Sequence, residues 1–235
     1  IPSSLGLSNA TELDGATVCI QTGTTTELHL ADFFRLNGIS YEALPIETND
    51  EGKENLFAGR CDVYTTDASG LSSTRAAAAD PSKWLVLPEI ISKEPLGPLV
   101  RHGDHQWGDV VRWSLNAMII AEELGITSEN VDASLGSNVP EVLRLLGVEG
   151  SYGEMLELAP DWAYQIIKQI GNYSESYEAN VGPDTPLEIA RGLNALWTQG
   201  GISIQHEDGR LEAMPREEAE AFIAAMPPER RSLYE

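Results

Sequence analysis

The stretch that decides the fold is Ala16-Thr17-Val18-Cys19-Ile20-Gln21-Thr22-Gly23-Thr24-Thr25-Thr26-Glu27. It begins with a short run of apolar and β-branched residues, which is typical of a buried strand. Gly23 then permits a sharp turn, and threonines that can cap a helix follow at once. Because the apolar residues continue at helical spacing, the sequence predicts a helix over Thr25–Leu36.

A strand, turn and helix in this order form a possible anion site. The turn aims unpaired backbone N–H groups, and the positive end of the helix dipole, at one point in space. We expect the amides of Thr24, Thr25 and Thr26 to hold a carboxylate there. The alternative is that Gly-Thr-Thr is only a well-capped turn between a strand and a helix.

A second turn and strand follow about forty residues later, in Ala58-Gly59-Arg60-Cys61-Asp62-Val63-Tyr64-Thr65-Thr66-Asp67. Parallel strands end at the same edge of a sheet, where open α/β sheets bind ligands. We therefore expect Asp67 to face the same crevice as the threonine amides and to accept a ligand ammonium group. The complementary ligand is a zwitterion. The alternative is that Asp67 only caps the next helix.

The charge of the chain limits its partners. The 235 residues include 37 acidic and 15 basic side chains, which gives a formal net charge of −22. Such a surface repels nucleic acid and anionic membranes, so neither is an expected partner. The sequence has no apolar run long enough to cross a bilayer and no charged and apolar leader, so we expect a chain that does not span the membrane. Since its first residue is Ile1, we expect a mature, processed form.

The two cysteines, Cys19 and Cys61, fall in the two strands just described. Neighbouring parallel strands bring side chains close enough for a disulfide if the register agrees, and an oxidising compartment would follow. A pair of metal ligands and two buried free thiols are the alternatives, although the metal pair lacks further ligands. The histidines show no metal-ligand spacing and are interpreted as surface residues: His29, His102, His105 and His206. We expect no metal and no cofactor.

Strands and helices alternate through the first hundred residues, which predicts an α/β fold with a largely parallel sheet. The other strands are predicted at Ser40–Ile46, Cys61–Thr66 and Trp84–Leu87, and the other helices at Asn49–Ala58 and Asp67–Ala79. Beyond Pro98 the composition favours helices, which are predicted at Gln106–Leu124, Pro140–Leu146, Trp162–Ile170, Glu175–Ala179 and Leu187–Trp197. Four tryptophans in these helices suggest either a ligand cage or, as we prefer, core packing: Trp107, Trp113, Trp162 and Trp197.

Several long motifs resemble one family, the type II periplasmic binding proteins of polar amino-acid ABC transporters, in particular the general L-amino-acid-binding branch. The resemblance covers residues 5–202. It rests on Gly23–Glu27 with Ala58–Asp62 and Asp67, and on Val86–Pro98, Asp161–Tyr173, Asn180–Pro183 and Ile189–Trp197.

The resemblance implies a periplasmic protein that binds L-amino acids and delivers them to the membrane subunits of an ABC importer. Thr25 and its neighbouring amides would hold the α-carboxylate and Asp67 the α-ammonium group, while Gln21 and Thr26 would line the cleft. Residues 1–98 would form the second α/β lobe with half of the cleft, and residues 99–202 the helical remainder of the first lobe. The last segment, 203–235, departs from the family as a charged tail with one helix over Arg216–Met226.

The family also has a segment ahead of the position of Ile1, which supplies most of the first lobe's sheet and an arginine for the ligand carboxylate. A truncated, non-binding interaction module is therefore the main alternative function. The helices of the incomplete first lobe would then pack on each other, or on a second copy in a homodimer. A dehydratase on this fold is a third reading, but only Asp67 offers acid–base chemistry in the expected cleft.

Overall fold

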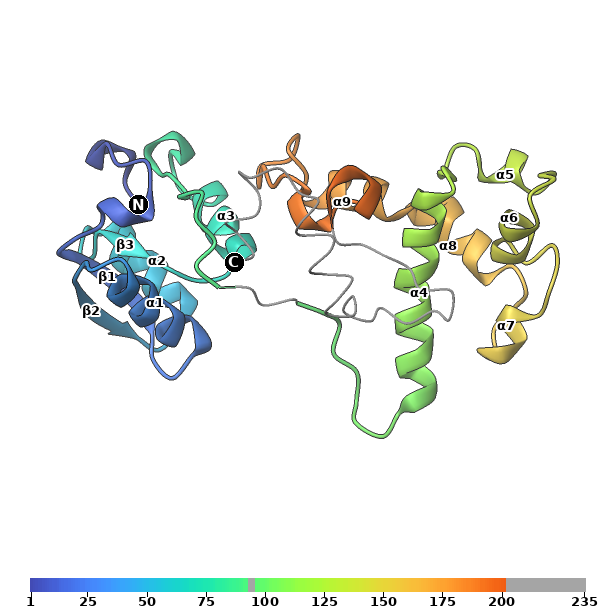
Figure 1. Ribbon diagram of the computed structural model, residues 1–235, viewed down its shortest axis with the longest axis horizontal. Helices are drawn as coiled ribbons and strands as arrows, with labels where there is room; N and C mark the ends of the chain where they lie inside the picture. Colours follow the sequence, from blue (N-terminus) through green and yellow to red (C-terminus); the bar gives the residue numbers. More distant parts are fainter. Residues whose placement is uncertain (93–95, 202–235) are drawn as a thin grey trace. The chain divides into compact units, whose positions relative to one another are not determined.

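The computed structural model describes residues 1–92 and 96–201 of the chain (Figure 1). The chain divides into two compact units. The first unit comprises Ile1–Leu99 and Tyr177–Ala190, and the second comprises Val100–Ser176 and the chain from Arg191. The sequence-based division places residues 177–190 in the helical portion, whereas in the structure they cluster with the α/β unit.

The α/β unit is built on a parallel sheet of three strands in the order β2-β1-β3, seen side by side in Figure 1. β1 spans Ala16–Gln21, β2 Tyr41–Ile46 and β3 Val63–Tyr64. β1 pairs with β2 along its whole length, but with β3 only through Val18–Val63 and Cys19–Tyr64. The parallel α/β architecture predicted from the sequence is confirmed.

The helices α1 (Thr25–Leu36) and α2 (Asn49–Phe57) cover opposite faces of this sheet. Successive strand residues point to opposite faces. Val18 and Ile20 pack with Leu30 and Phe34 of α1. Cys19 lies on the other face, in the cluster that contains Leu56 of α2. The alternation of β1 therefore fixes which helix lies on which face.

The unit also contains the helix α3 (Ala68–Ala76) and the 3₁₀ turns η1 (Ser3–Leu5), η2 (Ala10–Glu12) and η3 (Pro81–Lys83). The predicted strand at Trp84–Leu87 is wrong. Trp84 makes a single antiparallel bridge with Pro2, and the Leu85 amide donates to the Ile1 carbonyl. On one side of this bridge both segments turn away into 3₁₀ turns, at Ser3–Leu5 and Pro81–Lys83, so the ladder is not extended there.

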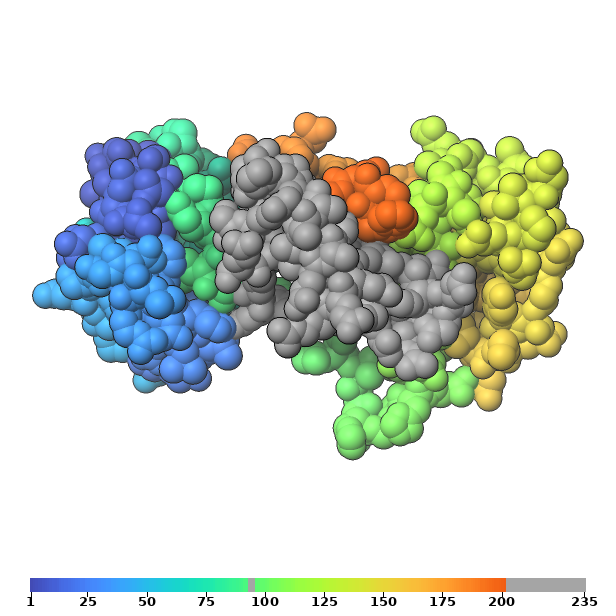
Figure 2. All heavy atoms as spheres, viewed as in Figure 1, coloured from blue at the N-terminus to red at the C-terminus, as the bar shows by residue number. Residues whose placement is uncertain are grey.

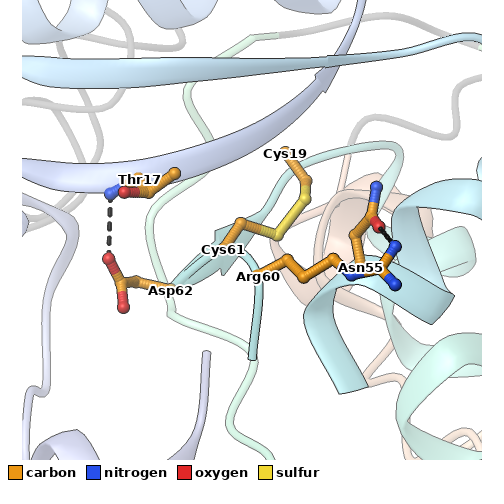
Figure 3. The surroundings of a disulfide bond; sticks show 6 residues. All are labelled: Thr17, Cys19, Asn55, Arg60, Cys61 and Asp62. Atoms are coloured by element: carbon orange, nitrogen blue, oxygen red, sulfur yellow. Dashed lines mark hydrogen bonds between the residues drawn. A yellow bond between two sulfur atoms is a disulfide. The ribbon is translucent and has the colours of Figure 1, made fainter. Parts of the chain in front are cut away.

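A disulfide joins β1 to the turn before β3, as predicted from the positions of the two cysteines in the sequence (Figure 3). The sulfur atoms of Cys19 and Cys61 lie 2.01 Å apart and the Cα atoms 5.8 Å apart. Both side chains are buried on the α2 face of the sheet. Beside them the Asp62 carboxylate accepts from the Thr17 amide at 2.9 Å, so this turn is held by a covalent bond and by a polar contact.

The second unit is helical and has its own core. Its helices are α4 (His105–Glu123), α5 (Val131–Ser134), α6 (Pro140–Leu145), α7 (Tyr152–Met155) and α8 (Trp162–Ile170), while α9 (Tyr173–Asn180) crosses the division between the units. The core joins α4, α5, α6 and α8 through fully or largely buried residues that include Ala121, Val131, Leu146 and Ile167. In Figure 2 the yellow residues of this unit form one continuous surface. The predicted helices over 106–124, 140–146, 162–170 and 175–179 are all found, within two residues at each end.

The predicted helix at Leu187–Trp197 is wrong. Glu188 has a left-handed backbone with φ 53°, and Gly192 has φ 49°. Only two short 3₁₀ turns form in this region, η4 (Gly192–Asn194) and η5 (Trp197–Gln199), with Ala195 extended between them. Left-handed residues interrupt an α-helix, so the apolar spacing here does not reflect a helical face.

The tryptophans differ in their surroundings. Trp162 packs against the helical core as expected, and Trp113 is half-buried, but Trp107 and Trp197 are 55% and 50% exposed. Among the helices of residues 1–92 and 96–201, none has the length and apolar composition to cross a membrane. The predicted tail helix at Arg216–Met226, with His206, lies outside the described residues.

Candidate functional site

Three helices of the α/β unit begin at the same edge of its sheet. α1 follows β1, α2 follows β2 and α3 follows β3, so each helix starts where a parallel strand ends. Each N-terminus offers amides without intrahelical partners and a partial positive charge. This edge therefore favours bound anions, and it is where open α/β sheets place their ligands.

The first turn of α1 is strongly capped. The Thr24 hydroxyl donates to the Gln21 carbonyl at 2.7 Å and accepts from the Glu27 amide at 3.3 Å. The Glu27 carboxylate accepts from the Gly23 amide at 2.7 Å. Thr24 is thus occupied as the helix cap, so its hydroxyl is already committed within the turn.

Thr25 and Thr26 occupy the first two helical positions, where amides have no carbonyl partner inside the helix. Thr25 is exposed and Thr26 is half-buried. Gln21, at the end of β1, donates its side-chain amide to the Glu47 carbonyl at 2.8 Å and thereby ties β1 to the end of β2. Of these residues, the amides of Thr25 and Thr26 are the best placed for a carboxylate.

α2 repeats the capping scheme of α1. The Thr48 hydroxyl accepts from the Glu51 amide at 3.2 Å, and the Glu51 carboxylate accepts from the Glu47 amide at 2.8 Å. Both helices therefore begin with threonine followed by glutamate three positions later, and in both the glutamate accepts from the amide of the residue before the threonine.

α3 begins differently, at Asp67. This residue holds the N-cap position, but its side chain makes no capping hydrogen bond. The carboxylate is exposed. The sequence left two interpretations of Asp67, a helix cap or a partner for a ligand ammonium group. The capping hydrogen bond is not observed, so the carboxylate is not engaged in capping α3.

A pocket of about 180 Å³ lies between α2 and α3 at this edge. Sequence reasoning missed it, because its walls come from three separate elements: Asn49, Lys53, Tyr64, Thr66, Gly70, Ser73 and Thr74. The one available signal is that Asn49 and Thr66 each follow the end of a parallel strand.

Tyr64 lines this α2–α3 pocket and is 4% exposed. Burial is the main cause of a raised pKa of its phenol, which the hydrogen bond to Thr66 and the charge of Lys53 oppose. The carboxylates of Asp50 and Asp67 add to the rise. Tyr64 therefore stays neutral at physiological pH and lies within the electrostatic reach of both a cation and two anions.

No cluster of three or more potential metal ligands occurs among the residues that the structure describes. His102 and His105 are exposed, as expected for surface residues, but His29 is half-buried with its Nδ1 atom enclosed. Sequence reasoning placed His29 too close to solvent, because it lies on α1 between the exposed Leu28 and the buried Leu30.

Comparison with known proteins finds relatives that are all named as binding proteins. The chain is 54% identical to the "Glutamate/glutamine/aspartate/asparagine-binding protein BztA" of Rhodobacter capsulatus over 203 residues. This match covers 86% of this chain and 60% of the relative. It is 53% identical to the "Putative amino-acid ABC transporter-binding protein YhdW" of Escherichia coli, over 84% of this chain and 58% of the relative. It is 52% identical to the "General L-amino acid-binding periplasmic protein AapJ" of Rhizobium johnstonii, over 86% of this chain and 60% of the relative. No protein-family model matches the chain.

A solved structure agrees with these sequences. An ABC transporter periplasmic binding protein from Brucella ovis, with glutathione bound, superposes with a TM-score of 0.78 at 50% identity, over 84% of this chain and 62% of that one. The chain thus spans about three fifths of the length of the curated relatives that it matches. It is a homologue of the periplasmic binding proteins of amino-acid ABC transporters and has their fold over the region that it spans.

Proposed function

We propose that this chain binds L-amino acids in the periplasm and delivers them to an ABC importer. The observation that carries the proposal is the uncapped carboxylate of Asp67 at the sheet edge where α1 also presents the amides of Thr25 and Thr26. An amino acid carries an ammonium group and a carboxylate on one carbon atom, which matches these two kinds of partner. Identity of 52% to 54% with proteins named for amino-acid binding supports it.

The names of the relatives suggest a broad ligand range. One is named for glutamate, glutamine, aspartate and asparagine, another for general L-amino acids, and the Brucella protein holds glutathione. Many of these ligands carry a second polar group beyond the α-carbon. In the proposal, binding closes one lobe over the other and the membrane subunits recognise the closed form.

The periplasmic location is supported by the Cys19–Cys61 disulfide, because such bonds persist in oxidising compartments. The relatives are binding proteins, and we accordingly propose binding rather than turnover. The dehydratase alternative requires a positioned acid–base group with a tuned pKa. Turnover assays with prephenate-like acids test that alternative directly.

Titration calorimetry with L-amino acids tests the proposed site. Asp67→Ala leaves a desolvated ligand ammonium unpaired and should cost about 2–5 kcal/mol in binding free energy. Thr25→Ala removes only a hydroxyl and should cost about 1 kcal/mol, because the backbone amide remains. Asp80→Ala is the control, since Asp80 instead caps η3 through the Ser82 amide.

Two outcomes contradict the proposal in different ways. Equal small effects of Asp67→Ala and Thr25→Ala place the site elsewhere on the chain. A complete lack of amino-acid binding by the unmodified chain favours the non-binding interaction module.

We also propose that the helical unit associates with a second copy or another covering partner. Large apolar side chains of this unit lie in solvent, including Met155 at 79%, Ile170 at 58% and Trp107 at 55% exposure. Apolar side chains favour association where they form one contiguous patch on the surface. Light scattering that reports only monomers over a range of concentrations contradicts the homodimer.

A further inference from the structure

Asn37 and Gly38 directly follow the last residue of α1, and both are exposed. Asn37 is the only asparagine in the amino-acid sequence that a glycine follows. Because glycine has no Cβ atom, its backbone nitrogen is less shielded from the side chain of the residue before it. An asparagine carboxamide therefore cyclises onto the next backbone nitrogen more readily in this pair than in other asparagine pairs.

The two residues belong to a closed turn that ends α1. Gly38 has a left-handed backbone with φ 68°, and its amide donates to the Arg35 carbonyl at 3.2 Å. The Ile39 amide donates to the Phe34 carbonyl at 3.0 Å, and Ile39 packs against the apolar cluster that contains Phe34. These two hydrogen bonds with the apolar contact form a Schellman motif.

The closed turn holds both groups that would react. The Gly38 nitrogen is engaged with Arg35, and the Nδ2 atom of Asn37 donates to the Phe33 carbonyl at 2.8 Å. The side chain of Asn37 can therefore reach the Gly38 nitrogen only when these hydrogen bonds open. Helix ends fray. Leu36, the last residue of α1, is 80% exposed and adds little packing to this end.

The helices α2, α4 and α6 end in the same kind of turn. In each, a glycine with φ between 67° and 73° follows the helix, and the next amide donates to a carbonyl five residues earlier. The residues before these glycines carry no side-chain amide: Ala58, Leu124 and Leu146. The turn therefore forms without such an amide, and Asn37 adds a reactive group that the turn does not need.

We propose that Asn37 is a modification site, which loses ammonia when the turn at the end of α1 opens. The Gly38 nitrogen bonds to Cγ of Asn37, its proton passes to solvent, and the bond from Cγ to Nδ2 breaks with release of ammonia. Water then opens the cyclic imide at either of its carbonyl groups. The product at position 37 is aspartate or isoaspartate.

Either product weakens the turn. Aspartate loses the Nδ2 donor to the Phe33 carbonyl and places a negative charge at the negative end of the helix dipole. Isoaspartate adds a backbone atom before Gly38 and so shifts Ile39 from its partner Phe34. The ring of Phe34 lies 4.7 Å from that of Tyr41 on β2, so the disturbance extends to the packing of α1 on the sheet.

Peptide mapping by mass spectrometry tests the site on the full chain, incubated at mildly alkaline pH with and without urea. Asn37 should convert faster than the exposed Asn138 and Asn194, which precede valine and alanine. It should also convert more slowly in the folded chain than in urea. Conversion no faster than at Asn138 and Asn194 overturns the site, and equal rates with and without urea overturn its control by the turn.

Ile39→Ala tests which opening exposes the site. Loss of this half-buried side chain should make the turn open more easily and raise the rate at Asn37 about tenfold in the folded chain, but not in urea. Leu56→Ala is the control, because Leu56 is buried on the other face of the sheet and destabilises the same unit away from the turn. An equal rise in both variants means that unfolding of the whole unit is required, which overturns the proposal.

Two substitutions at the site test the effect of the product. Asn37→Ala gives α1 the turn that ends α2, where Ala58 precedes the glycine. Asn37→Asp carries the charge of one product. The urea midpoint of unfolding should be lower for Asn37→Asp than for Asn37→Ala. Equal midpoints contradict the proposed weakening of the turn by the modification.

Discussion

The Glu27 carboxylate accepts a hydrogen bond from the Gly23 amide at 2.7 Å, in the turn where a ligand carboxylate is expected. A negative side chain thus already occupies part of the positive end of α1. It stabilises the helix but lowers the attraction of that end for a second anion.

Glu27→Gln should therefore strengthen amino-acid binding while it weakens the fold. Glutamine can still accept from the Gly23 amide, but the charge is lost. Charges at helix ends contribute about 0.3–1 kcal/mol, so we expect about a two- to fivefold gain in L-alanine affinity. Glu51→Gln is the control, because Glu51 makes the same contact with the Glu47 amide at α2. The L-alanine affinity measured by titration calorimetry should rise for Glu27→Gln only. An equal rise in affinity for both variants contradicts a carboxylate site at α1.

The Cys19–Cys61 disulfide should contribute strongly to the stability of the α/β unit. It closes a loop of 42 residues. On the chain-entropy model such a loop is worth about 4 kcal/mol. The double variant Cys19→Ala/Cys61→Ala should lose stability of this order in urea unfolding without reductant, and the same loss should follow when the parent chain is reduced. A midpoint unaffected by reductant argues that the bond does not form in solution.

Much of the α/β unit could be predicted because its signals are local. The apolar run of β1, the turn at Gly23 and the capping threonine fix strand, turn and helix within twelve residues. The disulfide followed from two predicted strands that proved to be neighbours, although Cys61 itself lies just before β3. The position of Asp67 between β3 and α3 could also be predicted from the sequence.

What could not be predicted depends on distant partners. Glu188 takes a left-handed backbone next to its ion pair with Arg75, which is 113 residues away in sequence. Arg191 is bound by Glu122, 69 residues away, and these contacts replace the helix that apolar spacing favoured. The α2–α3 pocket likewise has walls from β3 and from two helices, so no single stretch of sequence shows it.

Arg191 and Glu122 form a bidentate ion pair inside the helical unit, at 3.0 Å and 3.1 Å, with side chains only 12% and 7% exposed. The Tyr173 ring lies 5.1 Å from the guanidinium carbon. Breaking a buried pair leaves an uncompensated charge, at a cost of about 3–5 kcal/mol. Glu122→Gln should therefore lower the free energy of unfolding of this unit by roughly that amount, as thermal or urea unfolding can measure. A loss below 1 kcal/mol contradicts the ion pair's structural role.

The neighbouring residue Glu123 should show the opposite effect. Desolvation, with the nearby charges of Glu141 and Glu122, raises the pKa of its carboxyl. A carboxyl whose pKa is higher in the folded state favours folding at low pH, and this contribution is lost as the pH rises through the folded pKa. At neutral pH, Glu123→Gln should thus stabilise the unit, by about 0.2–0.5 kcal/mol for a relieved like-charge contact. The gain should vanish below the ordinary glutamate pKa of about 4.3. A gain that persists at acid pH contradicts the electrostatic cause.

Gly52 sets how closely α2 approaches the sheet. A Cβ atom at this position would lie 2.5 Å from Cε2 of Tyr64 and 2.7 Å from Cδ1 of Ile46, both of which are buried. Alanine is normally the better helix former by about 1 kcal/mol, so helix propensity alone predicts that Gly52→Ala stabilises α2. Overpacking of a core costs about 1–3 kcal/mol and should prevail, because both contacts are with side chains that are almost fully buried.

Gly52→Ala should therefore lower the free energy of unfolding by about 1–2 kcal/mol net. Gly97→Ala is the control, since no heavy atom lies within 4 Å of a Cβ built there. An unchanged unfolding midpoint in urea shows that α2 relaxes without cost and contradicts the close packing of Gly52 on Tyr64.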